Sequence, residues 1–451
     1  MFPDPPRGDG AMTMTVPPQA TRPDPVRRVA SPRIAALGNR PGPLAVAEFW
    51  GEIKTTGAPL LEDVADGACT YTFVHRGGPG TERVALFGNK IVDPKEIEHA
   101  FFSHVPGTDI WWYAIRLGSG WRGSYAIAAQ GGPQSRVAPE VAQMIELRRP
   151  RALAAAEPEH RDRIAMWFDL QHCAVADPFA RESARPGGYL PSVASGPDAP
   201  ASVLSAGPPD APRATAGPGR VVPVGDRARA DLWWHIPAGP APETWDVLVL
   251  LDGERWVDSG HVLDEWQAAG VLPPTVTLLV GSGDLERRVR DLTCSPELVA
   301  DLVRVLNAHT GDGFDSGGPL GAPLTADPAR TRIAGQSLGG LTALYAQCAA
   351  PERFGVSVCQ SGSFWWPNAV SGAHEAEWLT RAIADSGVRL GTVTLEVGLQ
   401  EWVLLEPTRR LREVLGRVCE RFSYGEFDGG HDEACWSTSL PGLLRDTVRR
   451  A

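Results

Sequence analysis

Residues 331–341 read Thr-Arg-Ile-Ala-Gly-Gln-Ser-Leu-Gly-Gly-Leu, and this stretch decides the fold of the C-terminal half of the chain. Its centre, residues 335–339, fits the pattern Gly-x-Ser-x-Gly with Ser337 in the middle. A short apolar strand over 332–334 precedes the pattern, and a helical run over 341–350 follows it. Glycines on both sides of a serine permit a sharp strand-to-helix turn in which a Cβ atom would clash. The stretch therefore predicts that a turn at the end of a strand presents Ser337 as a nucleophile.

Apolar strands and helical segments alternate on both sides of this stretch. The predicted strands are Val247–Leu251, Thr275–Val280, Thr331–Ala334, Gly355–Cys359, Val393–Val397 and Phe422–Phe427. Continuous apolar strands joined by helices indicate a mostly parallel sheet with helices on both faces. We therefore predict an α/β-hydrolase domain over residues 226–451. The alternative interpretation of residues 335–339 is a tight glycine turn with a capping serine.

The preceding part of the chain has a different pattern. From about residue 66 to 130, short β-like runs alternate with turns, which is typical of a small β-sandwich, so we predict a β-sandwich-like domain over residues 44–188. Its predicted strands are Cys69–His75, Arg83–Phe87, Ile110–Arg116 and Ser124–Ala128. Residues 1–43 are rich in Pro, Arg and Gly without periodicity, so we expect a disordered leader. Residues 189–225, rich in Pro, Ala and Gly, predict a linker between the domains.

Composition excludes several classes of protein. The net charge of -11 argues against a general binder of nucleic acid or membrane surfaces, since both need an excess of basic residues. The seven cysteines are widely spaced and form no Cys-x-x-Cys pair, which favours reduced thiols in a cytoplasmic protein. No signal peptide or long apolar run is recognisable. No His, Cys, Asp or Glu cluster has the spacing of metal ligands, so neither a metal nor another cofactor is expected. Oligomeric state is not indicated.

A serine nucleophile needs a base, and in this fold the acid and then the histidine follow the serine along the chain. Two histidines lie after Ser337, namely His374 and His431. His374 lies in a polar Ser-Gly-Ala-His stretch typical of a surface loop. His431 follows two glycines directly after the strand Phe422–Phe427, where the base of this fold is expected. We predict His431 as the base; the alternative is a loop histidine that caps the next helix.

The acid is expected in the loop after the strand Val393–Val397. Glu401, three residues beyond Gly398, fits best, and its role would be to fix the imidazole tautomer. Glu396 lies inside the strand, and Glu406 is expected to begin the next helix as an exposed carboxylate. Asp428 and Asp432 flank His431, and near neighbours in sequence are poor partners for orienting a ring.

Backbone amides are predicted to stabilise the oxyanion. One is the amide of Leu338, at the start of the helix after Ser337. The second is the amide of Gly253, in the Asp-Gly-Glu turn after the strand Val247–Leu251. An ordinary strand-end turn is the alternative for this second position.

The chain resembles the enterochelin (enterobactin) esterases, cytoplasmic hydrolases that open and cut catecholate trilactone siderophores. The most specific match is Gln-Ser-Gly-Ser-Phe-Trp-Trp-Pro at 360–367; others are Leu-Leu-Asp-Gly-Glu-Arg-Trp at 250–256, Asp-Gly-Gly-His-Asp at 428–432 and Cys-Trp at 435–436. In the N-terminal half, Gly-Thr-Asp-Ile-Trp at 107–111 and Trp-Arg-Gly-Ser-Tyr at 121–125 also match. The resemblance covers most of residues 45–450. It implies an N-terminal accessory domain that covers the active-site mouth or stabilises the fold.

The resemblance also implies an anionic and aromatic substrate, a ferric catecholate complex that brings its own iron. A pocket for it should supply Arg for charge and Trp for ring faces. Candidates near strand ends are Arg255, Trp256, Arg290, Trp365 and Trp366, with Arg287 and Arg288 in the same basic group. The alternative is that the tryptophans pack in the core and the arginines form a solvated helix face.

The implied function is hydrolysis of the trilactone esters of a ferric catecholate siderophore such as enterobactin, with release of iron. A general carboxylesterase or acyltransferase of the same fold is the first alternative. A siderophore-binding protein without catalysis is an alternative of another class.

Overall fold

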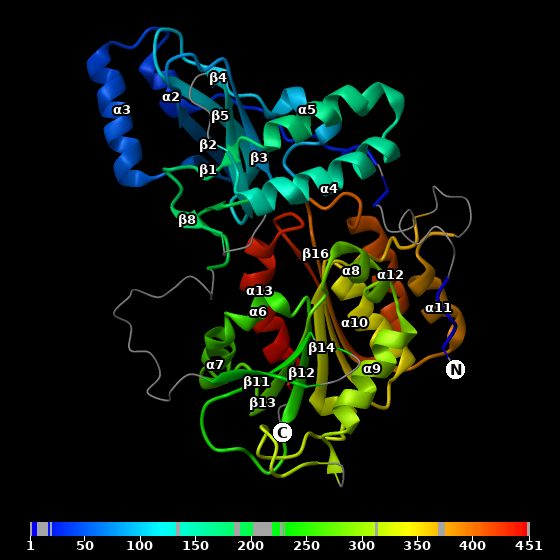
Figure 1. The fold of residues 1–451 in the computed structure, drawn as a ribbon. Coiled ribbons are helices and arrows are strands. Elements are labelled where there is room, and N and C mark those ends of the chain that lie inside the picture. The colour runs from blue at the N-terminus through cyan, green and yellow to red at the C-terminus, as the bar shows by residue number, and fades with distance from the viewer. Residues whose placement is uncertain are drawn as a thin grey trace.

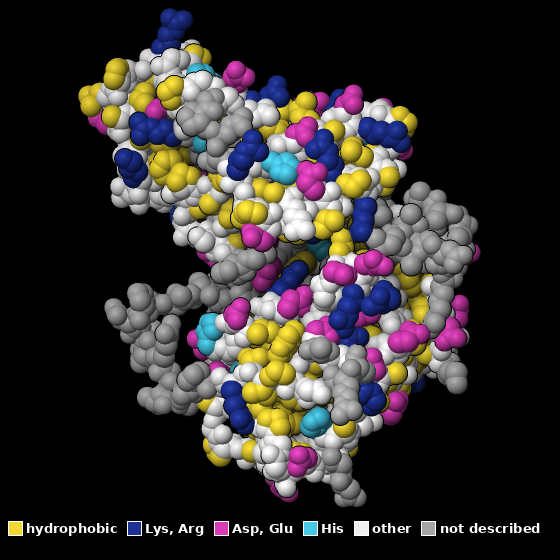
Figure 2. All heavy atoms as spheres, viewed as in Figure 1, with side chains coloured by type: hydrophobic (Ala, Val, Ile, Leu, Met, Phe, Trp, Pro, Cys, Tyr) yellow, Lys and Arg dark blue, Asp and Glu magenta, His cyan; other side chains and the backbone are white. Residues whose placement is uncertain are grey.

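The structure is a computed structural model that describes residues 2–6, 17–18, 20–131, 136–184, 190–201, 219–225, 229, 231–311, 314–368 and 375–448. Two domains follow one another along the chain, and the N-terminal domain lies above one end of the C-terminal sheet (Figure 1). In the space-filling view the surface is hollowed between the two domains, and acidic and basic side chains gather along this hollow (Figure 2).

The N-terminal domain contains two antiparallel sheets with a hydrophobic core between them. The first sheet has the order β1-β2-β5-β4, with bounds Leu60–Ala65, Ala68–Arg76, Ile110–Gly118 and Ser103–His104. The second has the order β3-β6-β9-β8 with β7 beside β6, and bounds Arg83–Gly88, Arg122–Gln130, Ser192–Ser195, Glu182–Ser183 and Ala174–Val175. Its helices are α2 (Pro32–Leu37), α3 (Pro43–Thr56), α4 (Pro139–Ala155) and α5 (Arg161–Gln171). Helix α4 buries Ile145 alone, and such a polar pattern did not predict a helix.

The C-terminal domain is built on an eight-stranded sheet of order β10-β11-β13-β12-β14-β15-β16-β17. The strands are Arg220–Pro223, Leu232–Ile236, Thr275–Val280, Asp246–Leu251, Thr331–Gln336, Val356–Gln360, Leu390–Gly398 and Cys419–Phe427, in that order. The pairs from β13 to β17 are parallel, and β10 and β11 extend the sheet in antiparallel register. The carboxyl ends of six neighbouring parallel strands, in the order β13-β12-β14-β15-β16-β17, therefore meet at one edge.

Helices cover both faces of this sheet, as the continuous apolar strands predict. In β12, Val247, Val249 and Leu251 belong to the larger core cluster, whereas Leu248 and Leu250 belong to a second cluster on the other face. The helices on the first face are α8 (Leu285–Asp291), α9 (Pro296–Asn307), α10 (Leu338–Ala349), α11 (Trp378–Ser386) and α12 (Leu405–Val418). Those on the second are α6 (Glu254–Val257), α7 (Gly260–Ala268) and α13 (Glu433–Thr447). The predicted fold class, an α/β-hydrolase domain after a β-sandwich, is confirmed.

Two predicted boundaries need correction. The leader predicted over 1–43 contains helix α2, which Ser31 caps by accepting the Ile34 amide at 3.2 Å. The Arg22 amide also donates to Asp93 at 3.1 Å, and Ile34 of α2 is buried in a hydrophobic cluster of this domain. One buried side chain in so short a helix gives the sequence no apolar periodicity. The linker predicted over 189–225 includes two strands, since β9 (Ser192–Ser195) pairs with β6 and β10 (Arg220–Pro223) pairs with β11.

Within the part of the chain that the structure describes, no helix combines the length and the apolar composition needed to cross a bilayer. His374, one of the two histidines considered as a base, lies outside the described residues.

Candidate active site

Ser337 lies on a tight turn between β14 and α10. Its backbone has φ of 58° and ψ of -122°, a conformation that residues other than glycine rarely adopt. A Cβ atom on Gly335 would lie 2.5 Å from the carbonyl carbon of Gly339, so the turn closes only with glycine at that position. The Ser337 amide donates to the Gln360 carbonyl at 3.1 Å, which fixes the turn against the end of β15. The serine side chain is therefore held at the carboxyl edge of the sheet.

Glu401 and His431 are in direct contact, as expected for an acid and the base it orients. The distance from His431 Nδ1 to Glu401 Oε2 is 2.6 Å. Glu401 is completely buried, whereas His431 is partly exposed. A buried carboxylate on one ring nitrogen fixes the proton there and leaves Nε2 as the acceptor.

Three further residues, which the sequence did not single out as functional, hold the Glu401 carboxylate in place directly or through a neighbour. Ser361, directly after β15, donates its hydroxyl to Glu401 Oε1 at 2.5 Å. The Gly398 amide donates to the same oxygen at 2.8 Å. Trp436 donates its indole N–H to Ser361 Oγ at 2.8 Å, and its ring meets the His431 ring edge to face at 4.8 Å. Ser361 and Trp436 belong to the stretches that carry the family resemblance, and this membership was the only signal in the sequence that could have identified them.

The order of the parallel strands brings these side chains together. Ser337 follows β14, Ser361 follows β15, Glu401 follows β16 and His431 follows β17. Because β14, β15, β16 and β17 are neighbours in the sheet, their following loops lie side by side at one edge. Glu406 lies instead on the exposed side of α12 and pairs with Arg409 at 2.8 Å.

The backbone N–H of Gly253 is already engaged in a hydrogen bond within the sheet. It donates to the Val280 carbonyl at 2.8 Å, and a Cβ atom at this position would lie 2.3 Å from the Val280 amide nitrogen. Gly253 therefore allows the turn after β12 to approach β13, and its N–H does not face a ligand. Leu338, the other predicted oxyanion donor, is the first residue of α10.

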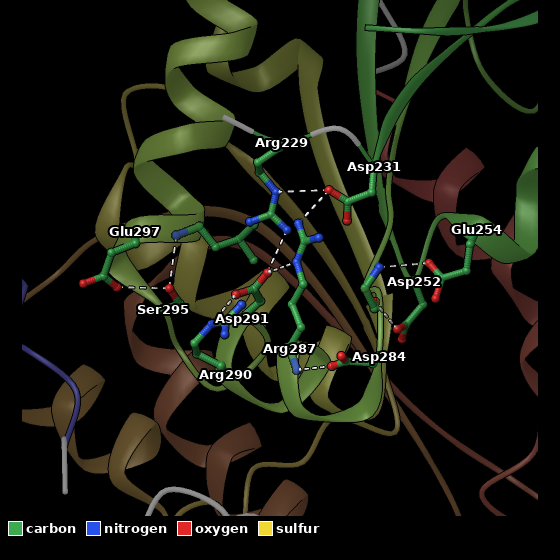
Figure 3. A network of polar contacts seen from close by, with 12 residues as sticks. Arg229, Asp231, Asp252, Glu254, Asp284, Arg287, Arg290, Asp291, Ser295 and Glu297 are labelled. Atoms are coloured by element: carbon green, nitrogen blue, oxygen red, sulfur yellow. Dashed lines mark hydrogen bonds and ion pairs between the residues drawn. The ribbon is translucent and has the colours of Figure 1, made fainter. Parts of the chain in front are cut away.

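The predicted basic group is largely neutralised by the protein's own carboxylates. Arg288 binds Asp252 through two hydrogen bonds of 2.6 and 2.7 Å, and the carboxylate holds the pKa of this guanidinium above its usual value despite burial. Figure 3 shows Arg287 between Asp231 and Asp291, with nitrogen–oxygen distances of 2.6 and 3.4 Å. The charges of these two arginines are therefore compensated by carboxylates of the protein itself, beside β12.

The two arginines proposed for substrate binding differ from this pair in exposure. The Arg290 side chain is 65% exposed and approaches Asp291 only at 3.4 Å. Arg255 is exposed on α6, directly after the carboxyl end of β12. Both therefore have charged groups that solvent, and hence an anionic ligand, can reach.

The three tryptophans proposed for substrate binding pack in the interior. Trp365 and Trp366 are 3% and 2% exposed and belong to the main core cluster. Trp256 is 6% exposed and packs edge to face against Trp266 at 5.4 Å. As placed, none of these rings presents a face to a ligand, and their packing role accounts for their position.

A second buried carboxylate, Glu396 in β16, accepts from Gln360 at 2.8 Å and from Ser439 at 2.6 Å. Burial raises its pKa to about 7, above its ordinary value near 4.5. Folding therefore favours the protonated form, so its contribution to stability is present at low pH and is lost as the pH rises through about 7. We expect Glu396→Gln to remove about 2 to 3 kcal/mol of the decrease in unfolding free energy between pH 5 and pH 8. Urea unfolding at both pH values measures this, and an unchanged pH dependence in the variant would contradict it.

A serine on a strained strand-to-helix turn, with a carboxylate and a histidine in contact on the following loops of a mostly parallel sheet, is the arrangement of the α/β-hydrolases. The protein is an esterase of this class. Residues 70–204 match the family profile described as "Enterochelin esterase, N-terminal", and residues 320–447 match the profile described as "Putative esterase".

Individual relatives resemble the chain over nearly its whole length. It is 30% identical to an iron(III) enterobactin esterase of Escherichia coli O6:H1, over 88% of this chain and 96% of the relative. It is 26% identical to an iron(III) salmochelin esterase of the same strain, over 90% and 95%. A crystal structure of the ferric enterobactin esterase of Salmonella typhimurium matches with a TM-score of 0.69 and 26% identity, over 89% of this chain and 98% of that one. The chain belongs to the iron(III) enterobactin esterase family.

Proposed function

We propose that this protein hydrolyses the ester bonds of a ferric catecholate siderophore of the enterobactin type, with Ser337 as nucleophile, His431 as base and Glu401 as acid. The observation that carries the proposal is the 2.6 Å contact between His431 Nδ1 and the fully buried Glu401 carboxylate. It lies at the same sheet edge as the strained turn that carries Ser337. A structure of the enterobactin esterase of Shigella flexneri determined in the presence of enterobactin, with a TM-score of 0.66 and 25% identity over 89% of this chain and 98% of that one, supports the choice of substrate.

In the first half of the proposed reaction, His431 Nε2 takes the proton of the Ser337 hydroxyl, and the serine oxygen adds to an ester carbonyl carbon. The carbonyl oxygen becomes an oxyanion, to which the Leu338 amide donates at the N-terminus of α10. Glu401 stabilises the imidazolium that forms. The tetrahedral intermediate then expels the alkoxide of the substrate's serine unit, which takes the proton from His431.

In the second half, water attacks the acyl-enzyme while His431 accepts one of its protons. Collapse of the second tetrahedral intermediate breaks the bond to Ser337 Oγ, which regains its proton from His431. The products are a free carboxylic acid and an alcohol. The iron stays with the catecholate groups through these steps and is cargo of the substrate.

The chain as a whole carries a net charge of -11, so binding of an anionic substrate requires positive charge close to the site. Arg255 and Arg290 are exposed, and Arg255 directly follows the carboxyl end of β12, where ligands of such sheets bind. We infer that Arg255 contributes to binding of the anionic complex. We also infer a cytoplasmic location, which the seven unpaired cysteine thiols support.

We expect kcat/KM for ferric enterobactin to exceed that for p-nitrophenyl butyrate by about 100-fold or more, because binding energy from the bulky substrate is used in the transition state. Product analysis by chromatography and release of p-nitrophenol measure the two reactions. Cleavage of the small ester without cleavage of the siderophore would identify a general carboxylesterase. Binding of the siderophore without any hydrolysis would identify a binding protein.

The proposed contribution of the Arg255 charge to substrate binding is tested with a matched control variant. Arg255→Gln should raise KM for the ferric siderophore about fivefold and leave that for the neutral ester unchanged, since an exposed charge contributes about 1 kcal/mol. Arg40→Gln, which removes an exposed arginine from the N-terminal segment, should change neither constant. Equal effects of Arg255→Gln on both substrates would assign Arg255 a structural role.

A further inference from the structure

The loop that carries His431 lies against the N-terminal domain. Arg122, the first residue of β6, donates its backbone amide to the Asp428 carbonyl at 3.1 Å. Its guanidinium Nε donates to the Ala434 carbonyl at 2.7 Å. The Arg122 side chain is only 6% exposed and also binds Ser195 and Glu182 of its own domain. One buried residue of the N-terminal domain therefore contacts both ends of the segment 428–434.

The middle of this segment is held as well. The Asn89 side-chain amide donates to the backbone carbonyl of His431 at 2.8 Å. The buried Asp432 carboxylate accepts the Ser124 amide of β6 with one oxygen and caps α13 with the other, where the Ala434 amide lies at 2.9 Å. The backbone N–H of Asn89 donates to the Ser124 carbonyl at 3.0 Å, which fixes the turn at Asn89 to the same strand, β6.

The glycines on either side of the interface allow this close approach. A Cβ atom on Gly430 would lie 2.8 Å from Asn89 Oδ1 and 3.0 Å from the Asn89 carbonyl oxygen. On the other side of the interface, a Cβ atom on Gly118 would lie 1.8 Å from Asp428 Oδ2. The Gly-Gly sequence before His431 thus fits the surface of the N-terminal domain.

The catalytic domain holds this segment at other points. Its Gln400 amide donates to the Gly429 carbonyl at 3.0 Å, and Glu401 holds the His431 ring. The contact to the His431 carbonyl, in contrast, comes from Asn89 of the other domain. The backbone and the ring of one residue are therefore fixed from two domains.

We propose that Asn89 is a positioning residue, through which the N-terminal domain sets the backbone of His431 and so the approach of its imidazole to Ser337. The proposal rests on the proposed role of His431 as the base. It assigns the N-terminal domain a part in catalysis that does not require contact with the substrate.

We expect Asn89→Ala to lower kcat for ferric enterobactin five- to tenfold with KM unchanged, because a lost hydrogen bond of ordinary strength lets the ring drift from its reactive position. Asn39→Ala, at an exposed site in the same N-terminal half, is the matched control and should leave kcat unchanged. A wild-type kcat in Asn89→Ala, or a change confined to KM, would overturn the proposal.

A second background separates this proposal from the proposed function. In His431→Ala, whose residual activity lacks the base, adding Asn89→Ala should cause no further loss. A further five- to tenfold loss in that background would show that Asn89 acts elsewhere and would overturn the positioning role. If His431→Ala itself retained wild-type activity, His431 would not be the base, and the mechanism in the proposed function would be wrong.

A pair of glycine variants tests the same interface in case Asn89→Ala folds poorly. Gly118→Ala places a methyl group against the Asp428 carboxylate and should lower kcat several-fold by shifting the loop. In Gly120→Ala, two residues away, the nearest atom lies 4.0 Å from the new Cβ, so kcat should not change. Equal kcat values for the two variants would contradict the proposal.

Discussion

Replacing Ser337 with alanine is expected to lower kcat for hydrolysis of ferric enterobactin by about 10⁴-fold or more, with the substrate still bound. The variant lacks the oxygen that forms the acyl-enzyme, so Glu401 and His431 have no nucleophile to activate. The residual rate comes from binding and oxyanion stabilisation alone. Chromatographic detection of cleaved siderophore measures the rate, and quenching of tryptophan fluorescence by the ferric complex measures binding.

Two features make this test sharp. Alanine carries a Cβ atom as serine does, so the backbone strain at φ of 58° is unchanged by the substitution. A thermal melt checks that the variant is still folded. Ser386→Ala is the matched control, because Ser386 is exposed at the end of α11, shortly before the amino end of β16 and not at the carboxyl edge, and should retain full activity. Undiminished hydrolysis in Ser337→Ala would show that the proposed nucleophile is wrong.

Most strands of the sheet could be predicted from the sequence because their burial leaves a continuous apolar run, whereas β10, inside the predicted linker, and β11 were not predicted. The prediction for 275–280 has the same bounds as β13, and that for 247–251 differs from β12 by one residue at its start. Helix α2 could not be predicted in this way, since it buries Ile34 alone and its segment is also held by polar contacts of Ser31 and Arg22 to residues far along the chain. Periodicity reports burial of one face, and it carries no information about such contacts.

The candidate site shows the same division. Chain order and loop position were enough to select Glu401 and His431, because parallel strands fix which loops share an edge. Ser361 and Asn89 could not be selected, since the hydrogen bonds that link them to Glu401 and His431 join residues 40 and 342 positions apart in the sequence. The catalytic roles of these residues remain predictions that the variants above and below test.

Tryptophans and glycines near strand ends were the hardest residues to interpret. A tryptophan is suited both to stacking on an aromatic ligand and to filling a core, so the sequence does not separate these roles for Trp365 and Trp366. The structure places both in the core. Gly253 fits either an oxyanion turn or a close backbone contact, and its approach to Val280 decides for the contact. In both cases the deciding quantity is the distance to a residue remote in sequence.

Glu401→Gln is expected to lower kcat by about 10³- to 10⁴-fold, although it changes the size of the side chain very little. The reason lies in the donors around Glu401. Oε1 accepts both the Ser361 hydroxyl at 2.5 Å and the Gly398 amide at 2.8 Å, so the oxygen of a glutamine must stay at that position. Its NH2 group then faces His431 Nδ1, which has to accept a hydrogen bond. The ring consequently carries its proton on Nε2 and is unable to take the proton of Ser337.

The control for this variant is Glu406→Gln, which changes an exposed carboxylate on α12 paired with Arg409 and should alter kcat less than twofold. A tautomer defect also predicts that Glu401→Gln leaves KM and the thermal midpoint close to those of the wild type, because the new amide still satisfies both donors. Nitrogen-15 NMR of the His431 ring reports the tautomer directly. A larger loss in Glu406→Gln than in Glu401→Gln would move the acid to Glu406, while a loss of kcat in Glu401→Gln with Nδ1 still protonated would leave the acid in place and reject the tautomer mechanism.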